Sequence, residues 1–149
     1  MHIKVEPVRR DNQFKGNVEG CDPRYSFRWI GKSNTVYVFE APIDMLSFIS
    51  MYQKGWMDHS YVALCGVAEH ALMQLLNDAP HISQIALCLD HDKAGIQARE
   101  RIKKNLSERG YHMVFSLFSN LKDWNEDLQE LKKPPPEYMN RQQTVIQMM

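Results

Sequence analysis

Two acidic residues, Asp90 and Asp92, follow directly on an apolar run near the middle of the 149-residue chain. The run at 85–89 reads Ile-Ala-Leu-Cys-Leu, and a helical pattern begins straight after the acids. A buried parallel strand has this pattern when it ends at the rim of a sheet, and ligands of open α/β sheets bind outside the carboxyl ends of the strands. Because Mg²⁺ takes oxygen ligands, commonly one or two carboxylates with phosphate oxygens and water, the motif predicts a metal-dependent phosphoryl-transfer site.

A second acidic pair, Glu40 and Asp44, follows the strand-like run at 35–39. If the two strands are neighbours, their carboxyl ends bring four carboxylates within a few ångströms of each other. Close like charges raise some carboxyl pKa values, which suits one acid to proton transfer, and they attract a divalent ion. Such an ion stabilises charge on a transferring phosphoryl group. The pattern therefore predicts Glu40 as general acid/base and Asp90 and Asp92 as metal ligands, with Asp44 as a further candidate ligand.

Helix geometry offers a structural alternative for two of these acids. Asp92 stands just before a predicted helix, where an Asp N-cap contributes about 1 kcal/mol. Asp44 falls in the first turn of another, where a carboxylate favours the helix dipole by about 0.3–1 kcal/mol. Neither explanation applies to Asp90 or Glu40, because both come directly at the end of an apolar strand.

Strand and helix patterns alternate along the chain and define the elements that must position the acids. Strands are predicted at 25–30, 35–39, 61–65, 84–89 and 113–118, and helices from 42 to about 54, at 68–79, 93–109 and 123–132. Turn residues at 31–34 predict that the first two strands form a β-hairpin. The alternation that follows predicts an α/β fold of Rossmann-like type, with a mainly parallel sheet and helices on both faces. The domain is expected at 25–133, after an irregular lead-in at 1–24 and before a Pro-rich linker and tail at 134–149.

Composition limits the classes of function. Hydrophobic residues make up 44% of the chain and charged residues 24%, which is typical of a soluble globular protein. No apolar run approaches the ~20 residues that span a bilayer, and no secretory signal opens the chain, so a cytoplasmic protein without membrane contact is expected. The three cysteines match no zinc spacing and predict no disulfide. With 18 basic and 18 acidic residues the formal net charge is zero, so nucleic-acid binding would need segregated charge or a partner.

The two acidic motifs together resemble the Toprim domain of bacterial primases, topoisomerases and some nucleases. Glu40-Ala-Pro-Ile-Asp44 after an apolar strand, and Asp90-His-Asp92-Lys-Ala-Gly95 after a later one, are similar to the strand-end Glu and the Asp-x-Asp pair of that family. The resemblance implies the Toprim fold, with Glu40 as acid/base and Mg²⁺, or Mn²⁺ as a substitute, on the Asp-x-Asp pair. It also implies close packing at Gly95 and a small residue, Gly66, near the phosphate or nucleic acid.

A second segment narrows the resemblance. Lys122-Asp123-Trp124-Asn125 looks like the segment that closes the Toprim-like domain of primase-type proteins on plasmids and other mobile elements. Two roles stay open for Asp123, a further metal ligand or the N-cap of the helix that follows. Lys93 likewise either contacts a phosphate or screens the paired acids.

The resemblance implies a primase-like nucleotidyltransferase that makes phosphodiester bonds in DNA replication of a mobile element. Nucleotides and nucleic acid, single-stranded DNA in particular, would be its ligands, and replication proteins such as a helicase its partners. Primases normally have a zinc-binding module and an extra basic subdomain, and this sequence shows neither, so a catalytic fragment or a subunit that depends on other proteins is one alternative. A small Toprim nuclease is a second. A non-catalytic module that binds Mg²⁺-nucleotide or a partner is another, and zero net charge supports it.

Overall fold

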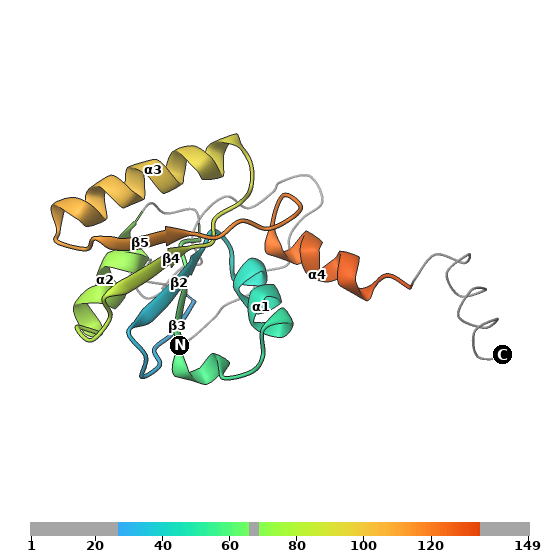
Figure 1. Ribbon diagram of the computed structural model, residues 1–149, viewed down its shortest axis with the longest axis horizontal. Coiled ribbons are helices and arrows are strands. Elements are labelled where there is room, and N and C mark those ends of the chain that lie inside the picture. Colours follow the sequence, from blue (N-terminus) through green and yellow to red (C-terminus); the bar gives the residue numbers. More distant parts are fainter. Residues whose placement is uncertain (1–26, 66–68, 135–149) are drawn as a thin grey trace, which may run out of the picture.

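The computed structural model describes residues 27–65 and 69–134, which form one sheet flanked by helices (Figure 1). The strands are β1 (Arg28–Trp29), β2 (Thr35–Phe39), β3 (Ser60–Ala63), β4 (Gln84–Leu87) and β5 (Met113–Ser116). The helices are α1 (Pro42–Met51), α2 (His70–Asp78), α3 (Lys93–Glu108) and α4 (Trp124–Lys132), with a short 3₁₀ helix, η2 (Trp56–Asp58). Every predicted helix is present within about two residues of its expected ends, except that α1 ends about three residues early, at Met51.

The strands lie in the order β1-β3-β2-β4-β5, and β2 occupies the centre. The pairs β2–β3, β2–β4 and β4–β5 are parallel, with Val38 opposite both Val62 and Leu87. The carboxyl ends of β2 and β4 are therefore adjacent, which meets the condition on which the two acidic motifs could come together. This arrangement confirms the α/β fold with a mainly parallel sheet.

The predicted hairpin between the first two strands is wrong. β1 pairs with β3 in antiparallel fashion, and β2 lies on the other side of β3. The connecting segment bonds to the start of β3 and to the chain before it, because Ser33 N–H donates to the Asp58 carbonyl at 2.7 Å and Gly31 N–H donates to Ser60 Oγ at 3.0 Å. A Cβ at Gly31 would lie 2.4 Å from the carbonyl oxygen of His59, so this close approach requires glycine.

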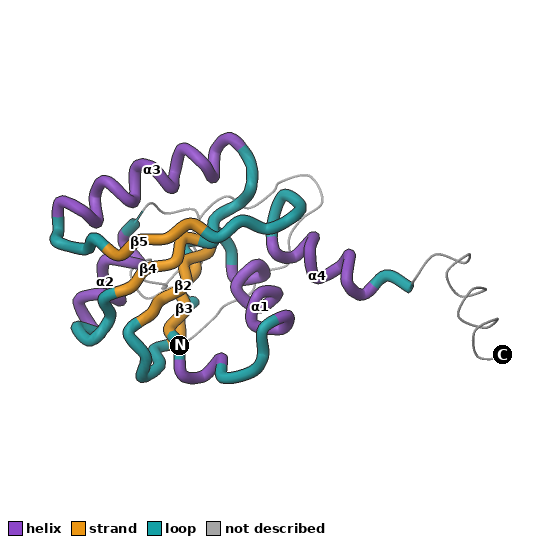
Figure 2. Tube along the Cα trace, viewed as in Figure 1, coloured by secondary structure: helices purple, strands orange, loops and turns teal. Residues whose placement is uncertain are grey.

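Two apolar clusters cover the two faces of the sheet, and Figure 2 shows the helices on both sides of it. Alternate residues of each strand point to opposite faces. One face packs on α2 and α3 through residues such as Val36, Leu72 and Ile102. The other packs on α1 and α4 through residues such as Phe48 and Trp124. The expected helix layers on both faces are thus confirmed.

Several expectations fall on residues outside the described ranges. These are the lead-in at 1–24, Gly66 and the tail at 135–149, so the predicted domain boundaries stay predictions. Within the described ranges, no helix combines the length and apolarity needed to cross a bilayer.

Candidate metal centre

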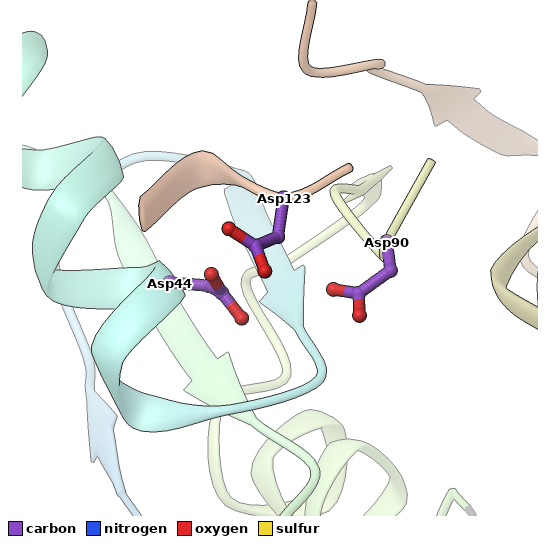
Figure 3. A group of neighbouring side chains, drawn as sticks. All are labelled: Asp44, Asp90 and Asp123. Carbon is purple, nitrogen blue, oxygen red and sulfur yellow. The ribbon is translucent and has the colours of Figure 1, made fainter. Parts of the chain in front are cut away.

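Three carboxylates meet at the carboxyl-terminal rim of the sheet (Figure 3). Asp44, Asp90 and Asp123 each place an oxygen within 4.8 Å of the other two. Asp44 is buried, and the other two are half-buried. We refer to these three residues as the acidic triad.

Asp44 reaches the triad from the first turn of α1. The helix begins at Pro42, whose fixed φ suits the first helical position, directly after β2 and the acidic residue Glu40. Asp44 Oδ1 accepts a hydrogen bond from the backbone N–H of Asn125 at 3.2 Å. This bond links α1 to the start of α4. Asp44 therefore connects its own helix to the helix that Asp123 caps.

Asp90 reaches the triad from the extended chain that follows β4. Cys88 N–H donates to the Val38 carbonyl at 2.7 Å, which continues the pairing of β4 with β2 beyond the last strand residue. Gly95, in the first turn of α3, lies against Asp90, and a Cβ there would come within 1.9 Å of the Asp90 carbonyl oxygen. The close packing expected at Gly95 is therefore present, and it positions the backbone of Asp90.

Asp123 caps α4 and also belongs to the acidic triad. Its Oδ1 accepts from the Glu126 backbone N–H at 2.8 Å and caps α4, while the carboxylate also belongs to the triad. The next residue holds the helix in place, because Trp124 Nε1 donates to the buried carbonyl of Cys88 at 2.9 Å. The Trp124 ring also meets Phe48 of α1 edge-on, with 5.0 Å between the ring centroids.

The other predicted site residues that the structure describes do not belong to the acidic triad. Asp92 lies outside the triad, and its Oδ1 accepts from Gly95 N–H at 2.7 Å as the N-cap of α3. Lys93 is the exposed first residue of α3. Glu40 is half-buried beside the triad, and its charge acts on both Asp44 and Asp90.

Crowding and burial favour the protonated forms of two triad members. Burial, followed by the charges of Glu40 and Asp44, raises the pKa of Asp90 to about 7. Burial also raises the pKa of Asp44 to about 6, although the hydrogen bond from Asn125 opposes the shift. A divalent cation would relieve this repulsion, since it favours the ionised form of each carboxylate.

Arg99 is a buried cation at the same rim that sequence patterns did not reveal. Its guanidinium donates to the carbonyls of Leu87, Leu89 and Leu117 at 2.6–2.8 Å and lies 4.1 Å from the centroid of the Phe118 ring. Burial lowers the pKa of Arg99, while the charges of Glu40 and Asp90 act in the opposite direction. Arg99 thus fastens β4 to the chain after β5 and puts a positive charge behind the acids. A basic residue on an amphipathic helix is expected to face solvent, so its place in the sequence did not indicate that Arg99 is buried.

The loop before α4 is joined to the Asp-x-Asp loop. His91 N–H donates to the Lys122 carbonyl at 2.6 Å, and His91 Nδ1 lies 2.8 Å from the Ser119 carbonyl oxygen. Asp127 accepts from the backbone N–H groups of Asn120 and Leu121, both at 2.8 Å. These bonds give His91 and Asp127 structural roles and hold Asp123 in place.

The donor set of the triad fits a hard divalent cation. Carboxylate oxygens are the ligands that Mg²⁺ prefers, and two ligands on opposite sides of a six-coordinate Mg²⁺ lie about 4.2 Å apart. The oxygens of the triad lie within 4.8 Å of each other, so a small inward shift of the side chains would let them share one ion. Three carboxylates carry enough negative charge to offset a dication, and phosphate or water oxygens would complete its coordination.

A family model described as Toprim-like matches residues 37–128, which is more than half of the chain. The chain belongs to the Toprim-like family. The matched range contains Glu40, the Asp-x-Asp pair and all three residues of the triad. Divalent metal binding is typical of Toprim domains, and the triad supplies suitable ligands here.

Two curated relatives are uncharacterized proteins of Mycoplasma species. The M. pneumoniae protein is 31% identical over 96 residues, which cover 64% of this chain and 43% of the relative. The M. genitalium protein is 30% identical over 97 residues, which cover 64% and 42%. This Toprim-like chain therefore spans less than half the length of these relatives.

A solved structure with the same fold is the primase fragment of the bacteriophage T7 primase-helicase protein. The TM-score is 0.54 with 24% sequence identity, over 75% of this chain and 44% of that fragment. At this identity the likeness is one of fold, and it agrees with the predicted Toprim architecture.

Proposed function

We propose that this Toprim-like domain carries out Mg²⁺-dependent nucleotidyl or phosphodiester transfer on nucleic acid, in a primase-like role. The observation that carries the proposal is the meeting of Asp44, Asp90 and Asp123 at the rim of the sheet, next to Glu40. Carboxylates from three separate elements converge there although their mutual repulsion raises two of their pKa values. A cation site gives that convergence a physical reason.

Each acidic residue has a distinct role in this proposal. The triad holds Mg²⁺, which when bound supplies stabilisation of the charge on a phosphoryl group. Glu40 takes the proton from an attacking hydroxyl or returns it to a leaving oxygen. Asp92 keeps its predicted part in metal binding as an outer carboxylate that also caps α3. Lys93 and Gly66 contact phosphate oxygens of the nucleic acid.

The primase-like assignment has two supports. The segment Lys122–Asn125 resembles one found in primase-type proteins, and it supplies both a triad member and the anchor of α4. The fold is also that of a fragment described as the primase of a primase-helicase protein. Nucleotides and single-stranded DNA would then be the ligands, a helicase a suitable partner, and replication of a mobile element the setting.

A non-catalytic module that binds Mg²⁺-nucleotide or a replication partner is the second candidate. The balance of 18 basic and 18 acidic residues favours it, because strong binding of a nucleic-acid backbone draws on an excess of positive charge. A small nuclease uses the same acids and is distinguished by its products.

The test is an assay with single-stranded DNA, nucleoside triphosphates and Mg²⁺ or Mn²⁺, run on the full chain and on Glu40→Gln. The primase-like proposal expects oligonucleotide products from the wild type, at least about 100-fold fewer from Glu40→Gln, and equal Mn²⁺ binding by both. Glu108→Gln makes the same chemical change at an exposed position at the end of α3 and should leave the products unchanged.

The outcomes separate the candidates. Cleavage of the DNA without synthesis would replace the primase-like assignment by the nuclease. Equal inactivity of wild type and Glu40→Gln, with metal binding intact, would support the binding module. If Asp90→Asn and Asp123→Asn both bind Mn²⁺ as tightly as the wild type, the proposed metal site is contradicted.

A further inference from the structure

A pocket lined by aromatic rings opens on the face of the sheet that α1 and α4 cover. Its volume is about 490 Å³, within the range of small-molecule sites. Seven of its eleven lining residues carry an aromatic or imidazole ring. No member of the acidic triad lines it, so it is distinct from the metal centre. We propose that this pocket binds the planar ring of a nucleobase.

The rings form a continuous set of stacking surfaces. Tyr37 and Tyr61 lie opposite each other on β2 and β3, and their rings are stacked with 5.5 Å between centroids and 19° between planes. Phe48 lies 5.2 Å from Tyr37 and 4.8 Å from Tyr52. Tyr52 is 57% exposed, so its ring is available at the mouth of the pocket. A flat aromatic ligand is the shape that such surfaces bind best, by offset stacking.

The hydroxyls of Tyr37 and Tyr61 give the pocket polar groups that a ligand could contact. Tyr61 is 2% exposed, yet no hydrogen bond joins its hydroxyl or that of Tyr37 to the described residues. Both tyrosines line the pocket, so each hydroxyl can form a hydrogen bond with a polar atom of a bound ligand in place of water. Within the described ranges the side-chain atom that is sealed without a partner is Arg99 Nε, so the Tyr61 oxygen still opens onto accessible space. Burial raises the pKa of Tyr61 to about 12.

Further polar groups at the edge of the pocket suit a heteroaromatic ring. Lys54 and the side-chain amide of Asn120 are exposed there, and both provide N–H donors. Ser33 Oγ lies 2.8 Å from His59 Nδ1, which leaves the other ring nitrogen of His59 for a ligand. Both carboxylate oxygens of Asp127 already accept backbone N–H groups. The pocket thus offers mainly donors, and nucleobases carry ring nitrogens and carbonyl oxygens that accept them.

The pocket shares its helices with the metal centre. Phe48 lies one turn after Asp44 on α1, and Trp124 is adjacent to Asp123 at the start of α4. A ring bound between these helices contacts the same two elements that position two of the three carboxylates. Occupation of the pocket is therefore expected to hold α1 and α4 in their present relative position.

The test uses the full chain in EDTA, so that it does not depend on metal or catalysis. Adenosine, guanosine, cytidine and uridine are titrated separately by calorimetry, and a short single-stranded oligonucleotide forms a parallel arm. Saturable binding is expected for at least one nucleoside, or for the oligonucleotide if the base is presented in a strand. Tyr61→Phe should weaken that binding about tenfold through loss of one hydrogen bond. Tyr52→Ala should weaken it by a similar factor or more through loss of a stacking ring.

The matched control is Tyr111→Phe, which removes a hydroxyl from a half-buried tyrosine packed on the opposite face of the sheet. It should bind as tightly as the wild type. The proposal is overturned if neither the nucleosides nor the oligonucleotide bind at millimolar concentration, or if Tyr61→Phe and Tyr52→Ala bind as the wild type does. Because no metal is present, failure here leaves the proposed function untouched, and failure of the catalytic assay leaves this result untouched.

Discussion

The Asp90 carbonyl oxygen lies so close to Gly95 that a Cβ on the glycine would come within 1.9 Å of it. Gly95 N–H also donates to Asp92 Oδ1 at 2.7 Å, so one glycine meets both members of the Asp-x-Asp pair. Through these two contacts the start of α3 fixes the conformation of the loop that carries Asp90, and we call this the template role of Gly95. Glycine at this position is a requirement of the candidate metal centre rather than of the helix.

Replacement of Gly95 by alanine separates these two requirements. Helix propensity alone would stabilise the protein by about 1 kcal/mol. We expect instead a lower free energy of unfolding and weaker Mn²⁺ binding, because the new methyl group displaces Asp90. Chemical denaturation and metal titration measure the two effects, with Ala94→Ser, at an exposed neighbouring position, as the control. A more stable variant with unchanged metal affinity would refute the template role.

Protons should compete with the metal ion at the triad. The pKa of Asp90 is raised to about 7 and that of Asp44 to about 6, so both carboxyls gain protons as the pH falls below neutrality. Mn²⁺ affinity is therefore expected to rise at least about tenfold from pH 5.5 to pH 7.5. Calorimetric titration across this range measures it. In Asp90→Asn the affinity should be low throughout and its pH dependence smaller, whereas a flat wild-type profile would argue against the triad as the binding site.

The metal-free protein should lose stability as the pH rises toward 7. The raised pKa values mean that the unfolded chain releases the protons of Asp44 and Asp90 from about pH 4, while the folded protein retains them until about pH 6–7. Their contribution to stability is thus complete below pH 4 and lost by about pH 7. Melting temperatures in EDTA should show a smaller decline over this window in Asp90→Asn than in the wild type. Mg²⁺ should raise the melting temperature more at pH 8 than at pH 5.

A control for this pH profile is available at Asp78. The hydrogen bond from Arg28 lowers the pKa of Asp78, so its contribution has the opposite sign and is lost as the pH falls. Asp78→Asn should therefore leave the decline between pH 4 and pH 7 in place. An unchanged profile in Asp90→Asn would contradict the assigned pKa shift.

Arg99 should be among the most sensitive positions for stability. Arg99→Met keeps much of the apolar stem but leaves the carbonyls of Leu87, Leu89 and Leu117 without their donor. We expect a loss of more than about 3 kcal/mol in the free energy of unfolding, measured by chemical denaturation. Arg101 lies on the same helix as Arg99, and Arg101→Met breaks an exposed ion pair with Glu69, the N-cap residue of α2, which should cost no more than about 1 kcal/mol. Similar losses in the two variants would show that the Arg99 bonds add little.

The indole of Trp124 should influence metal binding without touching the metal. Trp124→Phe removes the donor to the buried Cys88 carbonyl and is expected to cost about 1–3 kcal/mol of stability. Because Asp123 precedes this anchor, Mn²⁺ affinity should fall as well. Trp29→Phe also removes an indole-to-carbonyl bond, to Met57 at 3.1 Å, but at an exposed position at the far edge of the sheet. That variant should bind Mn²⁺ normally, and parallel losses in both would point to general destabilisation.

Local patterns were sufficient to predict most of the fold. Apolar runs ending in Glu40 and in Asp90 mark two parallel strands, and the structure shows that these two strands are neighbours. Pairing of the first strand could not be read in this way. It depends on contacts between Gly31 and the backbone at 58–59, far along the chain, and local turn chemistry at 31–34 is equally compatible with a hairpin.

For the candidate site too, some residues could be predicted from local patterns and others could not. Asp90 and Asp44 were predicted because each follows a strand end, and both belong to the triad. Asp92 and Asp123 share the sequence context of a helix N-cap, so spacing alone could not tell which one also joins the triad. The structure places Asp123 there because Trp124 docks α4 beside β4. Arg99 escaped notice because its burial depends on three carbonyls from separate segments.

The docking of α4 also has a consequence for the order of events during synthesis on the ribosome. Asp44 and Asp90 leave the ribosome well before Asp123, and the bond between Asp44 and the Asn125 N–H has to wait for the helix that follows. A nascent chain that has completed the four strands β1–β4 already possesses most of the sheet but only two of the three acids. Translation therefore delays assembly of the full ion site until α4 has been made and has docked on α1.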